Sequence, residues 1–105
     1  MRHPSLEVVI DNGGGITVQC ARFVHAYDNP AQAAADVAQL LAGTDTSDWE
    51  GHNPIDRIQY SGEDIRNGGY RVWDAEALRA ATIKDADNDG WHNARAFLFA
   101  LIAAR

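Results

Sequence analysis

Residues 85–90 read D-A-D-N-D-G and match the first half of a calcium-binding EF-hand loop. Such a loop binds Ca²⁺ through oxygen ligands at alternating positions, and a bidentate glutamate at position 12 completes the coordination shell. Position 12 falls here on Ala96, whose side chain has no ligand atom. The fragment therefore predicts either a weak divalent-cation site or a turn whose aspartates begin the last helix. The ligands of the cation site would be Asp85, Asp87, Asp89 and Asn93.

Acidic residues in the middle of the chain form a second candidate site. The formal net charge of −6 disfavours a protein that binds nucleic acid by neutralising phosphates, since such proteins concentrate lysine and arginine. Residues 28–56 contain no lysine or arginine and carry the whole net charge. This segment predicts a surface that attracts a basic protein partner, although acidic loops also serve only to keep a protein soluble. The predicted contact residues are Asp45, Asp48, Trp49, Glu50 and Asp56.

Trp49 has two interpretations. An exposed tryptophan among carboxylates can anchor a contact with a partner, whereas a buried one folds back as a lid on the core. Residues 44–54 around it have neither helical nor strand periodicity and predict a long loop. Loops of this length without structure of their own tend to be functional or disordered.

The remaining polar residues do not form a catalytic motif. The four histidines are too scattered for a zinc site, and the single cysteine permits neither an intramolecular disulfide nor a cysteine-based zinc site. Cys20 and His25 have an odd separation, which places them on opposite faces of a regular strand. We therefore expect a protein that is not an enzyme. A small enzyme that brings Cys20, His25 and a carboxylate together is the remote alternative.

The N-terminal elements follow from hydrophobic periodicity. Apolar and polar residues alternate over residues 6–11 and 16–20, which predicts a β-hairpin with a glycine-rich turn at 12–15. After Ala21 the alternation changes phase. This change indicates a bulge near residues 21–22, or a long strand that changes the face it buries.

A helix is predicted next, because both of its ends are marked. Asn29 can cap the first turn, Pro30 suits the first helical position, and Gly43 can end the helix in the left-handed conformation. Between them, apolar residues recur at helical spacing. This helix is expected to pack on the hairpin.

The second half of the chain predicts two short strands and two helices. Residues 57–60 read as a strand, and Ser61 with Asp64 can then cap a short helical turn. In the alternative, residues 67–69 form a second hairpin turn. Further elements are a strand over 70–73, a helix that Asp74 caps and that extends to about Ile83, and a last helix from about Trp91.

The last helix is apolar on all sides near its end. Residues 96–104 contain no polar side chain, and nine residues are too few to span a membrane. Leu98, Leu101 and Ile102 are expected to face the sheet, whereas Phe99 points elsewhere. Phe99 is then covered by the acidic loop or takes part in an interface. The residues of a possible homodimer interface are Phe99 and Ala103.

Together these patterns predict a single α+β domain over residues 1–105. A small, mainly antiparallel sheet packs against a central helix and two C-terminal helices. The 46% hydrophobic and 23% charged composition is that of an ordinary globular protein. No apolar segment of the kind a secretory signal needs follows Met1, so we expect a cytoplasmic protein.

The short length, the acidity, the preference for arginine over lysine and the elements D-N-G-G-G and R-N-G-G-Y-R-V give the chain a wider likeness. It resembles small proteins of phages and mobile elements in GC-rich bacteria, a class that includes anti-CRISPR proteins. The resemblance implies an inhibitor that binds a nucleic-acid-handling complex, sometimes with carboxylates in place of phosphates. Our leading hypothesis is a non-enzymatic acidic protein that acts through protein contacts, without direct nucleic-acid or membrane binding. The alternative is a calcium-binding module over residues 85–96.

Overall fold

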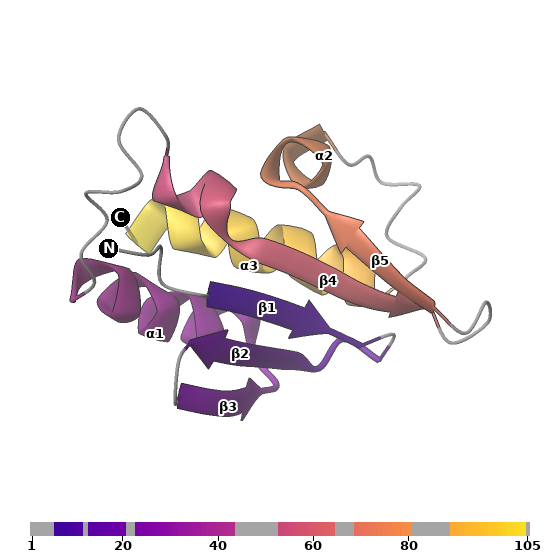
Figure 1. Ribbon diagram of the computed structural model, residues 1–105, viewed down its shortest axis with the longest axis horizontal. Helices are drawn as coiled ribbons and strands as arrows, with labels where there is room; N and C mark the ends of the chain where they lie inside the picture. The colour runs from indigo at the N-terminus through magenta and orange to yellow at the C-terminus, as the bar shows by residue number, and fades with distance from the viewer. Residues whose placement is uncertain are drawn as a thin grey trace.

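The computed structural model describes residues 6–11, 13–20, 23–43, 53–64, 69–80 and 89–104. In these ranges the chain forms a five-stranded sheet of order β3-β2-β1-β4-β5, with helices against it (Figure 1). The predicted α+β class with a mainly antiparallel sheet is confirmed. The elements are β1 (Leu6–Ile10), β2 (Ile16–Cys20), β3 (Phe23–Tyr27), α1 (Pro30–Ala42), the 3-10 helix η2 (Pro54–Arg57), β4 (Gln59–Asp64), β5 (Gly69–Trp73), α2 (Ala75–Ala80) and α3 (Asp89–Ala104).

Strands β1 and β2 form the predicted hairpin. Val8 pairs with Val18 in an antiparallel register, and both side chains are buried. In the turn, the Asp11 carbonyl accepts a hydrogen bond of 3.0 Å from the Gly14 amide, and the Asp11 carboxylate accepts one of 2.9 Å from the Gly15 amide. Gly14 has a φ of +89°, a conformation that side chains disfavour.

The predicted bulge or face-changing strand after Ala21 is wrong, because a separate strand, β3, follows β2. Cys20 pairs with Phe23 and Val18 with His25, so the chain reverses direction and β3 runs antiparallel to β2. The reversal explains the change of phase that the sequence shows. It also places Cys20 and His25 on the same face of the sheet, because directly paired residues share a face.

Helix α1 has the predicted N-terminus. The Asn29 side chain accepts from the Ala31 amide at 2.8 Å, and Pro30 occupies the first helical position. Gly43 follows the helix, but its φ of −89° is right-handed, so the left-handed conformation expected there is wrong. Its amide donates to the Gln39 carbonyl at 3.1 Å and continues the helical hydrogen-bond pattern.

Strand β4 differs most from the sequence prediction. Arg57 belongs to η2, and the strand begins at Gln59 and continues through Asp64, where a short helical turn was preferred. β4 is parallel to β1, and β5 is antiparallel to β4. The second hairpin, which was the alternative prediction, is therefore the one that forms.

The helices pack on one face of this sheet. α1 contacts β2 and β3, α3 contacts β1 and β4, and both helices pack against each other (Figure 1). The side chains of Phe97, Leu98 and Leu101 are fully buried, whereas Ile102 is 40% exposed. The expectation that Ile102 faces the sheet is therefore wrong. Phe97 takes that place, since it lies three residues after the buried Ala94 and four before the buried Leu101.

The opposite face of the sheet is not covered by any helix within the described ranges. Val24 on β3 and Val72 on β5 belong to this face, and they are 64% and 62% exposed. Glu7 lies near its centre, between Gln19 and Gln59 in register. In the part of the chain that the structure describes, none of the helices is long and apolar enough to cross a lipid bilayer.

Candidate functional site: an acidic surface pocket

The short helix η2 positions Asp56, the one predicted contact residue that lies within the described ranges. Asn53 caps η2, since its side chain accepts from the Ile55 amide at 3.1 Å and its carbonyl accepts from the Asp56 amide at 2.9 Å. Ile55 is buried, and its carbonyl accepts from the Tyr60 hydroxyl at 3.4 Å. These contacts attach η2 to the core and leave Asp56 exposed at the surface.

Helix α2 brings further charges to the same place. The Asp74 carboxylate accepts from the Ala77 amide at 2.6 Å, so Asp74 is the N-cap that the sequence predicted. Ala75 and Leu78 are buried and direct the other side of the helix outward. Glu76 is exposed at the start of this helix, and Arg79 is half-buried near its end.

η2 and α2 line an open surface pocket of about 350 Å³. Its charged lining consists of three carboxylates and one guanidinium, so its formal charge is −2. One Asp56 oxygen lies 3.1 Å from Nη1 of Arg79, with the two side chains 46% and 37% exposed. An ion pair this exposed contributes only about 0–1 kcal/mol to stability, so a competing cation can displace it at low cost. The lining residues are Asp56, Asp74, Ala75, Glu76 and Arg79.

Tyr60 is a core residue whose hydroxyl feels the charges of two pocket residues, Arg79 and Asp56. Its side chain is fully buried, and burial raises the pKa of its hydroxyl well above the ordinary value. The charge of Arg79 lowers this pKa and that of Asp56 raises it, but burial dominates. The hydroxyl therefore stays protonated at neutral pH and serves as a hydrogen-bond donor, not as a general base.

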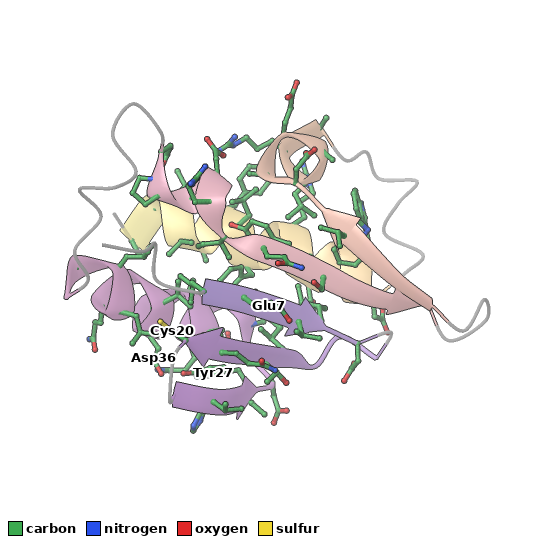
Figure 2. The ribbon with its side chains drawn as sticks, in the orientation of Figure 1. Glu7, Cys20, Tyr27 and Asp36 are labelled. Atoms are coloured by element: carbon green, nitrogen blue, oxygen red, sulfur yellow. The ribbon has the colours of Figure 1, made fainter. Side chains whose placement is uncertain are left out.

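The other acidic residues of the middle segment do not all contribute to this surface. Asp45, Asp48, Trp49 and Glu50 lie outside the described residues, so their predicted role stays a prediction. Asp36 lies on α1, and its carboxylate accepts from the Tyr27 hydroxyl at 2.6 Å and from Gln32 Nε2 at 3.2 Å (Figure 2). Its charge is thus engaged with β3, on a different element from the pocket.

The incomplete EF-hand fragment is described only in part. Asp85 and Asp87 lie outside the described residues, whereas Asp89 is exposed in the first turn of α3. Asn93 lies one turn later, and its Nδ2 donates to the Gly14 carbonyl at 2.8 Å. Its amide group therefore holds the β1–β2 turn against α3. Within the described ranges, no group of three or more histidine, cysteine, aspartate or glutamate side chains could hold a metal ion.

The residues of the remote enzyme alternative share one face of the sheet. Cys20 is half-buried at the end of β2. On β3, the ring centroids of His25 and Tyr27 are 4.6 Å apart. Burial and the Asp36 carboxylate raise the pKa of Tyr27 to about 12, so its hydroxyl also remains protonated at neutral pH. The Asp36 carboxylate accepts from Tyr27 and Gln32. That arrangement supports packing of α1 on β3.

The two residues of the predicted dimer interface lie on the outer side of α3. Phe99 is 42% exposed, and Ala103 is exposed as well. The Arg95 guanidinium lies over the Phe99 ring, with its central carbon 4.7 Å from the ring centroid. This cation–π contact orients the ring without burying it.

Sequence reasoning missed the contribution of Glu76 and Arg79 to the acidic surface. Both belong to a stretch of the chain whose charges balance, and no local pattern relates them to Asp56. Asp74 was predicted only as a helix cap. No family model matches this chain, and comparisons with curated proteins and with solved structures found no significant similarity.

Proposed function

We propose that this protein is a non-enzymatic binding protein whose acidic surface contacts a basic protein partner. The observation that supports the proposal is the pocket between η2 and α2, which three carboxylates and one guanidinium line. Because the carboxylates outnumber the guanidinium, the pocket has a net negative charge that attracts cations and accelerates association with a basic partner. The 45–50 segment, with its three acids and Trp49, precedes η2 in the sequence and extends the proposed contact.

An arginine of the partner has the chemistry that suits the pocket. Its planar guanidinium donates two parallel hydrogen bonds to a carboxylate, which favours arginine over lysine at such sites. Asp56 already binds Arg79 at 3.1 Å, so the partner's arginine can replace a pair that costs little to break. Glu76 is exposed beside this pair and adds attraction.

The biological role that we propose is inhibition of a nucleic-acid-handling protein in the cytoplasm. A basic surface that normally binds phosphates would instead meet carboxylates, as the resemblance to phage and mobile-element proteins implies. The net charge of −6 supports contact with such a surface and disfavours direct contact with nucleic acid.

Calorimetry with an arginine-rich peptide tests the proposal. We expect Glu76→Lys to weaken binding roughly tenfold more than Glu7→Lys. Both variants change the net charge equally, but only Glu76 lines the pocket, whereas Glu7 lies on the uncovered face of the sheet. Added salt should weaken wild-type binding. Equal losses in the two variants would show that the peptide senses only the total charge, and the pocket would not be the site.

A triple variant tests the segment outside the described residues. Asp45→Lys, Asp48→Lys and Glu50→Lys together should abolish peptide binding if this segment forms part of the surface. Asp74 is kept unchanged in all variants, because its carboxylate caps α2 and its removal would also destabilise the helix. Unchanged binding by the triple variant would exclude the segment from the contact.

A further inference from the structure

The outward side of α1 carries almost no charge. Among residues Pro30–Ala42 the only charged side chain is Asp36, and Tyr27 binds it on the side toward β3. A helix on the surface of a water-soluble domain usually presents charged residues to solvent. The exposed residues of α1 are Ala31, Gln32, Ala35, Gln39 and Ala42.

The second half of α3 continues this uncharged surface. α1 and α3 pack against each other on the same face of the sheet, so their outward sides adjoin (Figure 1). Residues 96–104 contain no charged side chain. Phe99 and Ile102 are 42% and 40% exposed there. We call the exposed residues of α1 and of the 96–104 segment the uncharged helical face.

The charges of the chain restrict which partner can bind to the uncharged helical face. We propose that it is the interface of a homodimer, in which a second copy presents the same face. Each copy has a net charge of −6, so two copies repel wherever carboxylates meet. The acidic pocket and the open sheet face with Glu7 would both bring like charges together. None of the exposed residues that define the helical face carries a carboxylate. The Arg95 guanidinium over the Phe99 ring is the charge beside the anchor, and it repels a basic partner.

The residue types of this face suit a twofold contact. In a twofold dimer the same patch faces itself, so the patch must contain both an anchor and a surface that receives it. The Phe99 ring, oriented by Arg95, is the anchor, since exposed aromatic residues dominate the binding energy of many interfaces. The alanines of α1 are small and allow a neighbouring helix to approach closely. Burial of Phe99 and Ile102 then supplies the driving force.

Sedimentation of the full chain over a range of concentrations tests the homodimer. We expect a reversible dimer at micromolar concentrations. Phe99→Glu should raise its dissociation constant about 30-fold or more, because it puts a charge at the anchor of both copies. Ala35→Glu should act in the same direction from α1. Val72→Glu is the matched control, since it adds the same charge on the open sheet face and should leave the dimer unchanged.

Salt separates this contact from the acidic pocket. Added salt should leave the dimer unchanged or strengthen it, because salt screens the repulsion between two acidic chains. Binding of a basic peptide at the pocket should weaken under the same conditions, so either proposal can fail alone. Thermal melting confirms that each variant is folded. A monomeric wild type up to about 100 µM, or a dimer that withstands both Phe99→Glu and Ala35→Glu, would overturn the proposal.

Discussion

Replacement of Gly62 by alanine is expected to destabilise the protein, because the indole ring of Trp73 lies directly against this glycine. A β-carbon on Gly62 would overlap Cη2 and Cζ2 of the Trp73 ring and lie 2.9 Å from its Cζ3. Trp73 is buried and makes an edge-to-face contact with Trp91, with ring centroids 4.8 Å apart. The ring therefore cannot move away from the added methyl group without losing this contact.

The expected loss follows from the cost of overpacking. Forcing one methyl group into a packed core costs about 1–3 kcal/mol. In a chain of 105 residues, each kcal/mol lowers the melting temperature by roughly 4–8 °C. Urea unfolding gives the free energy and thermal melting gives the temperature shift for Gly62→Ala. A variant as stable as the wild type would refute the argument that Trp73 requires a glycine here.

Gly43→Ala is the matched control for Gly62→Ala. A β-carbon on Gly43 would lie 3.6 Å and 4.0 Å from two carbonyl oxygens, which is ordinary contact, and the φ of −89° suits alanine. This substitution should leave stability unchanged or raise it by about 0.4–1 kcal/mol, because alanine reduces the entropy of the unfolded chain. A comparable loss at both positions would mean that the alanine itself, and not the overlap with Trp73, is the cause.

Two further predictions concern contacts between helices and strands. Asp36→Asn should lower the pKa of Tyr27 from about 12, because it removes the negative charge that accepts the hydrogen bond of the hydroxyl and disfavours tyrosinate. The absorbance of tyrosinate measures the change. The pKa of Tyr27 is higher in the folded chain than in the unfolded one, so the protonated hydroxyl stabilises the fold fully below pH 10. This stabilisation is lost as the pH rises from 10 through 12. A pKa that stays near 12 in the variant would contradict the role of the carboxylate. Asn93→Ala should cost about 0.5–1.5 kcal/mol and speed amide exchange in the β1–β2 turn, because it removes the bond to the Gly14 carbonyl. Exchange in this turn at the wild-type rate would indicate that α3 does not hold it.

Elements with strong local signals were predicted correctly from the sequence. Alternation over 6–10 and 16–20 gave the first hairpin, and Asn29 with Pro30 gave the start of α1. Asp74 was also recognised as the cap of α2. In each case the signal lies in a short, continuous stretch of the sequence, so residue types and their spacing carry the information.

Strand β4 shows how a local signal can be overridden. Ser61 and Asp64 form a capping pattern, and a helix cap contributes only about 0.5–2 kcal/mol. In the strand, Ser61 pairs with β1 on one side and with β5 on the other, and Asp64 pairs with β5. Two hydrogen-bonded ladders outweigh one cap, and the β1 partners are distant in the sequence, so no local pattern could reveal them.

The candidate site also has some properties that the sequence determines and others that depend on the tertiary structure. Composition alone determined that the chain is acidic, that basic residues are missing from 28–56, and that the last helix has more apolar surface than one buried side needs. Those properties depend only on residue types and short spacings. The tertiary structure decided that Asp56 shares its pocket with Asp74, Glu76 and Arg79, and that Phe99 stays exposed. Charges and apolar faces from distant segments meet only after sheet pairing and helix packing bring those segments together.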